Sequence, residues 1–331
     1  MTTNERGPGL LDPTSWNMDS SLDLMYSLVY GDELADLADV HDDILCMTAD
    51  LATSNRMSDF QRRHPDRFVD VGIAERNMTS MAAGLATCGY RVYISTFASF
   101  AGILAAENVR TDLAYPFQPV RILAHHAGIS FGFYGTSHHA TEDIAITRAI
   151  ADLCVTAPCD ANTTRAILRS TLDEPGPVYI RLGRGREKPI YEHVPDIARG
   201  RFLCPREGTD VTIIATGIGV QAAVEAHAIL AEEGISARVL DAVWLKPLDV
   251  DAVLAAARET SAIITVEDHN VMGGLGTAVA EVLADQSIRI PFMRHGIMDE
   301  YALIGPPTHL WRHYGIDGPG VAARVRETLA R

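Results

Sequence analysis

The chain has 331 residues, with 43 acidic and 28 basic side chains, and its formal net charge is -15. This length is sufficient for two domains, and an apolar share of 47% is sufficient for buried cores. The acidic balance argues against a nucleic-acid partner, because a protein that binds the phosphate backbone needs a basic surface.

The cysteines and the N-terminus indicate the cellular compartment. The five cysteines form no Cys-x-x-Cys pair, so the sequence predicts neither a disulfide framework nor a zinc site. Residues 1–9 lack the apolar core of a signal peptide. No apolar run approaches the roughly 20 residues that span a bilayer. We therefore expect a soluble, cytoplasmic protein with no membrane partner.

The first part of the chain alternates between strand and helix patterns. Residues 1–20 are rich in Gly, Pro, Asn, Asp and Ser and are typical of an N-terminal arm. The apolar spacing then predicts helix 22–37, strands 44–48 and 68–71, helix 72–85, strands 91–95 and 120–124, helix 143–150, strand 154–157, helix 162–172 and strand 178–182. This alternation is typical of a mostly parallel, doubly wound α/β sheet.

A second α/β pattern follows a stretch with little periodicity. Residues 185–208 are rich in Arg, Gly, Pro and Glu and are interpreted as a linker. Beyond it the spacing predicts strand 211–215, helix 219–233, strand 237–240, helix 250–259, strand 262–266, helix 274–284, strand 288–293 and helix 320–331. The predicted fold class is α/β, with two open, doubly wound sheets in domains at 21–184 and 209–331.

Ligands of open α/β sheets bind outside the carboxyl ends of the strands, where three segments are of interest. In the first, Glu75 falls in the first turn of a predicted helix. A carboxylate at this place can cap the helix or can bind a nitrogen-bearing ligand. In the second, Phe97 and Phe100 lie three residues apart. They are either part of the core or an aromatic wall for a flat ring.

The third segment is the histidine loop, residues 125–139, which holds four of the twelve histidines among several glycines. No cysteine or well-spaced carboxylate completes a familiar metal-ligand set, so proton transfer or anion binding by imidazole is favoured over metal binding. After a later strand, Arg184 can grip a phosphate or carboxylate, or can be a solvated linker residue. The glycine cluster at 272–276 is interpreted as a tight or interface turn.

Together these segments resemble the C-terminal half of transketolases, from about residue 20 onward. The matching segments are Ala49-Asp50-Leu51, Gly72-Ile73-Ala74-Glu75-Arg76-Asn77-Met78, Thr96-Phe97 with Phe100, the loop from His126 to His138, and Glu267-Asp268-His269-Asn270 followed by Gly273-Gly274-Leu275-Gly276. This family uses thiamine diphosphate and has a diphosphate-binding, a pyrimidine-binding and a C-terminal domain. The resemblance covers the last two.

The resemblance implies a split enzyme, because the chain contains no Gly-Asp-Gly followed 25–30 residues later by Asn, the family's magnesium and diphosphate signature. It implies a transketolase subunit that transfers a two-carbon ketol unit from a ketose or ketose phosphate donor to an aldehyde acceptor. Thiamine diphosphate would be shared with an N-terminal, diphosphate-binding subunit in an α2β2 heterotetramer. That partner would bind Mg²⁺, and this chain would provide no metal ligand.

The resemblance also implies how the cofactor is held. Glu75 matches the carboxylate that hydrogen-bonds N1′ of the aminopyrimidine and so promotes proton removal from the thiazolium ring. Such a glutamate is expected in a partly apolar site. Phe97 and Phe100 match the aromatic pocket for the pyrimidine, and Asp50 matches a residue near the cofactor at the subunit interface.

On the substrate side, the match is partial. Ser54, His126 and Arg184 fall where transketolases contact the sugar phosphate, and His138 falls where a histidine contacts substrate or intermediate oxygens. The family usually has an acidic residue three or four positions before the second histidine, but this chain has Phe133 and Tyr134 there.

A phosphate-binding arginine of the family is also replaced, by Tyr26. A tyrosine cannot replace a bidentate arginine contact. These departures predict a substrate-binding role for Tyr134 and an acceptor that is less polar or unphosphorylated.

Two other functions share this fold. One is the β subunit of a 2-oxoacid dehydrogenase E1 component, which uses the same glutamate mechanism with lipoamide. The other is a non-catalytic subunit that regulates a partner. The Gly-Ile-Ala-Glu-Arg-Asn-Met pattern and the histidine-ended loop favour a transketolase, and the presence of Glu75 with the paired phenylalanines argues against a non-catalytic role. Relatives that make deoxyxylulose phosphate share the Ala74-Glu75 pattern but fuse all three domains.

Overall fold

Seven strands form the first sheet of the computed structural model, which describes residues 29–184 and 187–330. The strands are β1 (Ile44–Thr48), β2 (Phe68–Asp70), β3 (Arg91–Phe97), β4 (Val120–His125), β5 (Cys154–Thr156), β6 (Val178–Arg181) and β10 (Trp244–Lys246). Their order is β10-β5-β6-β4-β3-β1-β2, and all neighbours are parallel except β10 with β5. The predicted arm, residues 1–20, lies outside the described residues.

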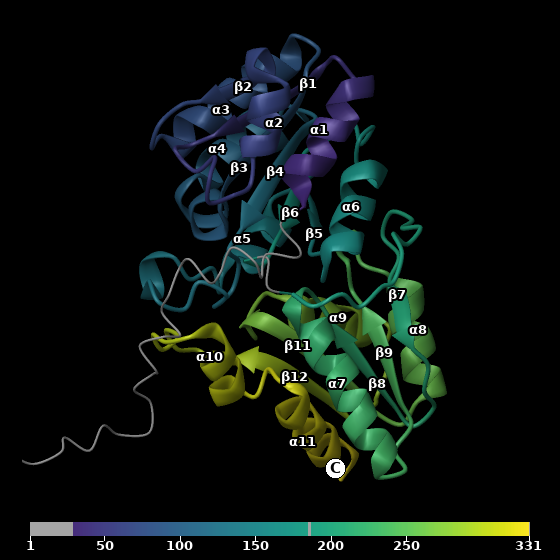
Figure 1. Ribbon diagram of the computed structural model, residues 1–331. Coiled ribbons are helices and arrows are strands. Elements are labelled where there is room, and N and C mark those ends of the chain that lie inside the picture. The colour runs from purple at the N-terminus through teal and green to yellow at the C-terminus, as the bar shows by residue number, and fades with distance from the viewer. Residues whose placement is uncertain (1–28, 185–186, 331) are drawn as a thin grey trace, which may run out of the picture.

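Helices cover both faces of this sheet (Figure 1). The helical segments are α1 (Tyr30–Val40), α2 (Ser58–Arg63), η3 (Pro65–Arg67), α3 (Glu75–Thr87), η4 (Phe100–Leu104), α4 (Ala106–Asn108), η5 (Val109–Ala114), η6 (Gly135–Ser137), α5 (Asp143–Ala149) and α6 (Ala161–Ser170). Alternate strand residues point to opposite faces. Thus Ile44 and Tyr93 pack with α1 and α6, whereas Met47 and Ile94 pack with α3. The first sheet is therefore doubly wound, as predicted.

The second sheet has the same construction. Its strands are β7 (Leu203–Arg206), β8 (Val211–Ala215), β9 (Ala237–Asp241), β11 (Ile263–Asn270) and β12 (Phe292–Ile297), and its helices are α7 (Ile218–Glu232), α8 (Val250–Glu259), α9 (Leu275–Asp285), α10 (Pro307–Tyr314) and α11 (Gly318–Leu329). The order is β12-β11-β8-β9-β7, and only β7 is antiparallel to its neighbour. Helices α7 and α11 cover one face, and α8 and α9 cover the other.

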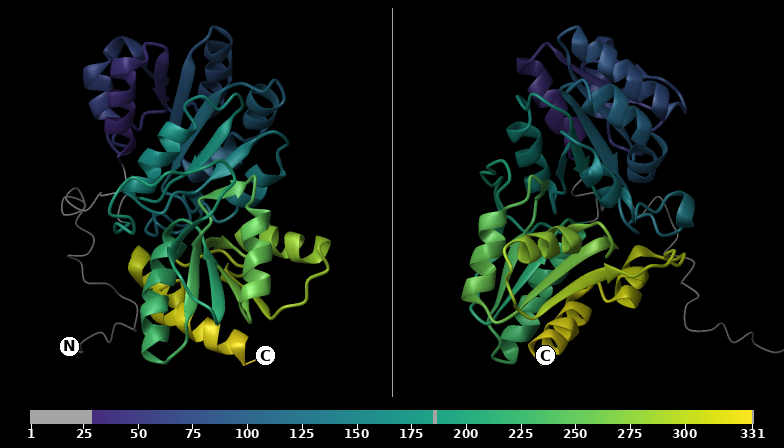
Figure 2. Two further views of the ribbon diagram at one scale, coloured as in Figure 1. Left: turned by 90° about the vertical axis from the view of Figure 1, so that its right-hand side faces the viewer. Right: turned by 180° about the vertical axis from the view of Figure 1, so that it is seen from behind.

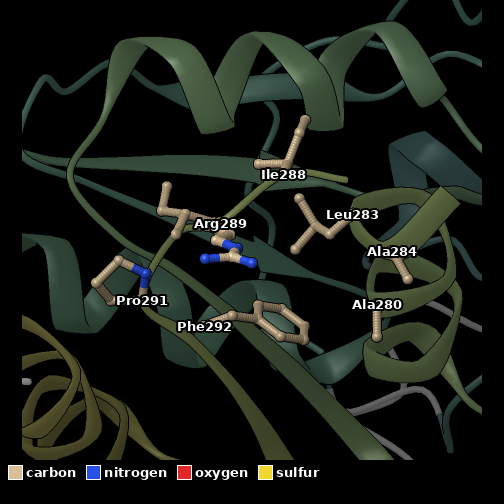
Figure 3. Close-up of a pocket in the computed structure, with 8 residues that line it drawn as sticks. Ala280, Leu283, Ala284, Ile288, Arg289, Pro291 and Phe292 are labelled. Carbon is tan, nitrogen blue, oxygen red and sulfur yellow. The ribbon is translucent and has the colours of Figure 1, made fainter. Parts of the chain in front are cut away.

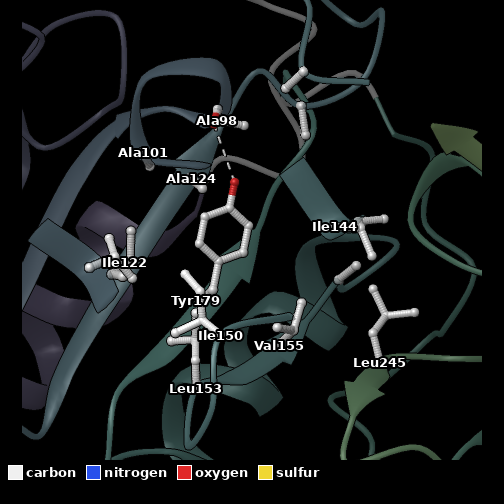
Figure 4. Close-up of a cluster of buried hydrophobic side chains, with 14 of the residues drawn as sticks. Ala98, Ala101, Ile122, Ala124, Ile144, Ile150, Leu153, Val155, Tyr179 and Leu245 are labelled. Carbon is white, nitrogen blue, oxygen red and sulfur yellow. Dashed lines mark hydrogen bonds between the residues drawn. The ribbon is translucent and has the colours of Figure 1, made fainter. Parts of the chain in front are cut away.

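The two domains share structure across their boundary. Strand β10 comes from the second part of the chain but pairs with β5 of the first sheet. One apolar cluster continues from the first sheet, through Tyr179 and Leu245, to α8 and α9. Figure 4 shows Tyr179 among these side chains, with its hydroxyl donating to the backbone oxygen of Ala98 at 3.4 Å. The views in Figures 1 and 2 show the region of α10 reaching from the second domain to the histidine loop.

Several elements differ from the prediction. The stretch interpreted as a linker contains β7, which extends the second sheet. Helix α3 begins at Glu75 rather than at Gly72, because Gly72 has φ of +69° and is not helical. Strand β12 begins at Phe292, four residues later than predicted. In the part of the chain that the structure describes, no helix has the length and apolar character needed to cross a membrane.

Candidate functional site

Five neighbouring strands deliver predicted site residues to one edge of the first sheet. Along this edge run β2, β1, β3, β4 and β6. They end at, or are followed by, Glu75, Asp50, Phe97, His126 and Arg184, respectively. The strands are mutually parallel, so residues far apart in sequence meet at a common carboxyl edge.

Glu75 is the first residue of α3 and is buried, with 5% of its surface exposed. The turn before it is held by Asp70, whose Oδ1 accepts hydrogen bonds from the backbone N–H groups of Asp50 (2.9 Å) and Gly72 (3.0 Å). The positive end of the helix dipole stabilises a carboxylate at this position. Within the described residues, no hydrogen bond or ion pair engages the Glu75 carboxylate, which is therefore available to a ligand.

Phe97, the last residue of β3, lies at the centre of an aromatic cluster. Its ring centroid lies 5.4 Å from that of Phe100, 5.6 Å from Phe131, 4.9 Å from His126 and 5.3 Å from His138. Phe100 opens the π-helical segment η4, and its ring meets Phe97 edge-on, at 84°. Such pairs contribute about 0.5–1.5 kcal/mol beyond their burial. The cluster forms an aromatic wall beside the sheet edge.

Tyr134 covers the outer side of this cluster. Its ring stacks on Phe131 with centroids 4.2 Å apart, lies 4.8 Å from His138, and is 51% exposed. The guanidinium of Arg184 lies 4.6 Å from the Phe131 centroid, in cation–π geometry. Five predicted site residues thus meet around Phe131, which was not itself predicted: Phe97, His126, Tyr134, His138 and Arg184. In the sequence, only the position of Phe131 between the glycines of the histidine loop pointed to a role in the site.

Burial favours the neutral imidazole at two histidines of the cluster, His125 and His138. The Nδ1 atoms of His125 and His126 are 2.6 Å apart, so one donates and the other accepts. Burial lowers the pKa of His125 to about 3, and burial also lowers the pKa of His138. His138 Nδ1 lies 2.9 Å from Ser137 Oγ. Neutral imidazoles can both donate and accept hydrogen bonds, which suits contact with hydroxyl and carbonyl oxygens.

Other predicted residues lie outside the aromatic cluster. Asp50 is exposed and has φ of +60°. Ser54 Oγ donates to the backbone oxygen of Leu51 at 3.2 Å, within the loop after β1. Among the described residues, the ring contacts of the cluster do not extend to either side chain. Tyr26 lies outside the described residues, and Phe133 is a half-buried member of the histidine loop.

Three polar atoms beside the cluster are buried without a partner among the described residues, and of their residues only Ser99 was not noted in the sequence. Thr96 Oγ1, Ser99 Oγ and His125 Nε2 are buried and have no hydrogen-bond partner in the described chain. These three residues lie at or next to the carboxyl ends of β3 and β4. A buried polar group without a partner costs about 1–3 kcal/mol, so a ligand that supplied polar atoms here would be stabilised. A flat heterocycle with ring nitrogens has this character.

Neither a metal centre nor the surface pocket of Figure 3 provides a competing site. No group of three or more His, Cys, Asp or Glu side chains suited to a metal occurs in residues 29–184 and 187–330. The pocket in Figure 3 lies on the second domain, between α9 and β12. It is lined by Ala280, Leu283, Ala284, Ile288, Arg289, Ile290, Pro291 and Phe292. Arg289 is its only titratable side chain, and none of the predicted site residues lines it.

Comparison with known proteins agrees with this geometry. The family described as "Transketolase, pyrimidine binding domain" matches residues 23–188, and "Transketolase, C-terminal domain" matches residues 200–321. The "Putative transketolase C-terminal section" of Methanocaldococcus jannaschii is 40% identical, over 91% of this chain and 95% of the relative. One of the subunits of the apulose-4-phosphate transketolase of Phocaeicola vulgatus is 38% identical, over 91% of this chain and 96% of the relative.

Comparison with a solved structure also shows similarity to a transketolase. The protein described as "Split gene transketolase, inactive beta4 tetramer" is 41% identical, has a TM-score of 0.83, and matches over 91% of this chain and 97% of its own. Agreement in sequence and fold over nearly the whole length of both chains shows common family membership. The chain therefore belongs to the transketolase family and carries its pyrimidine-binding and C-terminal domains.

Proposed function

We propose that this chain is the pyrimidine-binding subunit of a split, thiamine diphosphate-dependent transketolase. It would transfer a two-carbon ketol unit from a ketose or ketose phosphate donor to an aldehyde acceptor. The observation that supports this most is the buried carboxylate of Glu75, which no described residue engages, at the same sheet edge as the aromatic cluster. A hydrogen bond from Arg76 Nε to the backbone oxygen of Leu104 (3.0 Å) ties the start of α3 to η4.

These residues fit the aminopyrimidine of thiamine diphosphate. Glu75 would hold a proton at ring atom N1′, and its burial strengthens that hydrogen bond by excluding water. Phe97 and Phe100 would orient the ring, and Asp50 would lie near it at the subunit interface. When bound, the cofactor supplies the electron sink for cleaving and forming the carbon–carbon bond.

The histidine loop and Arg184 would bind the substrate. His126 and His138 present imidazoles at the wall of the site, where they would hydrogen-bond substrate oxygens and move protons. Arg184 would bind an anionic group, and Ser54 would contact the donor from the loop after β1. The replacement of an acidic residue by Phe133 and Tyr134 supports an acceptor that is less polar or unphosphorylated.

The acceptor proposal is tested by comparing pentose phosphates with unphosphorylated and apolar aldehydes in the assembled enzyme. We expect a higher kcat/KM for the second group, because Tyr134 offers them an exposed aromatic face. Full activity with xylulose 5-phosphate and ribose 5-phosphate would contradict this acceptor preference. It would leave ketol transfer itself intact.

A second polypeptide would complete the site by binding the diphosphate and Mg²⁺. Large apolar side chains are exposed around Glu75 and the histidine loop, as expected of a surface that a partner covers. They are Ile73, Ile103, Leu104, Leu303 and Ile304. The similar solved protein is described as an inactive tetramer of β chains, which supports the need for an α subunit. We propose an α2β2 assembly.

The variant Glu75→Gln tests the proposed function in the reconstituted assembly. A glutamine cannot hold the proton at N1′ in the same way, so kcat should fall by about 10²–10⁴-fold while assembly and folding persist. Glu107→Gln, which changes an exposed carboxylate on the nearby α4, is the matched control and should leave kcat unchanged. Unchanged turnover in Glu75→Gln would contradict the proposed role.

A further inference from the structure

The glycines of the histidine loop lie against the second domain. A Cβ on Gly128 would lie 2.3 Å from the carboxyl group of Asp268, and one on Gly132 would lie 2.3 Å from the backbone oxygen of Gly305. A Cβ on Gly135 would lie 2.8 Å from Ile304 Cδ1. The loop's glycine content is therefore explained by close approach to the second domain.

Asp268, in β11 of the second domain, binds the backbone of this loop directly. Its carboxylate oxygens lie 3.2 and 3.3 Å from the N–H of Ile129, which donates to them. The indole Nε1 of Trp311, in α10, donates to the same carboxylate at 3.2 Å. Asp268 is 2% exposed, so these bonds to a charged group are made away from water and are each worth about 1.5–3 kcal/mol.

The other end of the loop is held through the same residue. The backbone oxygen of Asp268 accepts a bond from Arg181 Nη2 at 2.8 Å, and Arg181 Nη2 also donates to the oxygen of Ala140 at 3.1 Å. Ala140 and Gly128 exchange backbone hydrogen bonds of 3.0 and 3.1 Å, closing the loop. The buried ion pair of Arg181 with Asp143, at 3.0 Å, fixes the guanidinium. Asp268 thus bonds one end of the segment that carries the site histidines directly, at Ile129, and is linked to the other end, at Ala140, through Arg181.

We infer that Asp268 is a positioning residue, through which the second domain sets the position of His126 and His138. It does not touch the proposed substrate site and acts through the backbone of the loop. The geometric part of this inference stands on the contacts alone, and its effect on catalysis rests on the proposed function.

The neighbouring Glu267 provides a matched control. It is also buried in β11, and each of its carboxylate oxygens accepts one backbone bond, from Leu275 N–H (2.7 Å) and Gly276 N–H (2.8 Å). Those donors belong to α9, and no hydrogen bond among the described residues joins them to the histidine loop. Asp268→Asn and Glu267→Gln therefore make the same chemical change one residue apart, and each places an amide NH₂ against a donor.

Hydrogen exchange of the full-length chain tests the positioning role without any cofactor or substrate. In Asp268→Asn, amides of residues 128–140 should exchange at least tenfold faster than in the wild type, with residues 275–285 unchanged. Glu267→Gln should show the opposite pattern. In Asp268→Ala the amides of residues 128–140 should exchange faster still, because no side-chain acceptor remains for the N–H of Ile129. Unchanged exchange at 128–140 in Asp268→Asn, or equal acceleration there in Glu267→Gln, would overturn the inference.

The assembled enzyme provides the second readout. Asp268→Asn should raise KM for the acceptor and lower kcat/KM at least tenfold, whereas Glu267→Gln of equal thermal stability should keep both near the wild-type values. Equal kinetic effects of the two variants would overturn the catalytic part of the inference. If the assembly proved inactive in ketol transfer while the exchange difference held, the proposed function would fail but the loop contact would stand.

Discussion

The carboxyl edges of the two sheets are both formed by parallel strands, but they have different surroundings. At the edge of the first sheet, Glu75, Thr96 and His125 keep bonding capacity that no described residue uses. At the edge of the second sheet, Glu267 and Asp268 are fully engaged by backbone and side-chain donors. Most of this second edge is buried against the first domain.

The difference shows that fold topology alone does not make a site. Both edges collect polar residues at strand ends, where ligands of α/β sheets usually bind. At the second edge, burial raises the pKa of Asp268 to about 6 and that of Glu267 to about 7, although their hydrogen bonds oppose this shift. Asp268 joins the two domains and Glu267 holds the start of α9, whereas the first edge keeps its acid for a ligand. Substitutions at the two edges test this division of roles.

The largest expected effect comes from filling the space between the two edges. Gly128→Ala places a Cβ against Asp268 at a residue with φ of +59°. The backbone strain of about 1–2 kcal/mol and the loss of a bond to a charged group of about 1.5–3 kcal/mol should lower the free energy of unfolding by about 3–5 kcal/mol. Gly234→Ala, at φ of +78° with open space around the glycine, should cost only the strain. Equal losses in urea denaturation would contradict the close contact.

A smaller effect is expected at Asp241, a third acid of the second edge. It accepts bonds from Cys159 Sγ (3.3 Å) and Tyr191 OH (3.2 Å), its Oδ1 has no partner in the described chain, and burial raises its pKa to about 7. Between about pH 4 and pH 7 the folded chain therefore keeps a proton that the unfolded chain has lost. The stability contributed by this residue is complete below pH 4 and falls by about 1.4 kcal/mol per pH unit up to pH 7.

Asp241→Asn removes this titration. Relative to the wild type, the variant should gain about 2–3 kcal/mol of unfolding free energy between pH 5 and pH 7, with no further gain above pH 7. Urea denaturation at pH 5, 6, 7 and 8 measures the difference. A difference between the two proteins that stays constant over this range would show that Asp241 does not hold a proton in the folded state.

Removing one ring from the first edge should have the smallest effect. Phe97→Leu keeps an apolar side chain but removes the aromatic contacts, so affinity for thiamine diphosphate in the assembly should fall about 3–10-fold. Phe60→Leu removes a buried ring that packs with His64 and Phe68 on the opposite face of the sheet. This control should lower stability and leave cofactor affinity unchanged. If Phe97→Leu and Phe60→Leu lost the same affinity for thiamine diphosphate, the aromatic cluster would have no specific role in binding the cofactor.

Much of the fold could be predicted because local periodicity reflects burial. The predicted ranges of β1, β8 and α8 coincide with those observed. Strand β10 was missed because its three residues pair with β5, about 90 positions earlier in the chain, and carry no periodic signal of their own. The π-helical form of η4 depends on tertiary packing and has no signature in the sequence.

The candidate site was predictable where motifs place residues at strand ends. The positions of Glu75, Phe97 and His126 at one sheet edge follow from the parallel strand order. The contact of Asp268 with Ile129 could not be predicted, because it joins residues 139 positions apart across two domains. The glycines of the histidine loop were noticed, but the neighbour that requires them is visible only in three dimensions.

Calorimetric titration of thiamine diphosphate with Mg²⁺ tests the central claim most directly. The claim is that this chain carries half of a cofactor site, the carboxylate and aromatic half, and that a partner supplies the rest. The purified chain alone should bind the cofactor weakly, and addition of the N-terminal subunit should produce tight, magnesium-dependent binding that Glu75→Gln weakens. Tight magnesium-dependent binding by the lone chain would contradict the account.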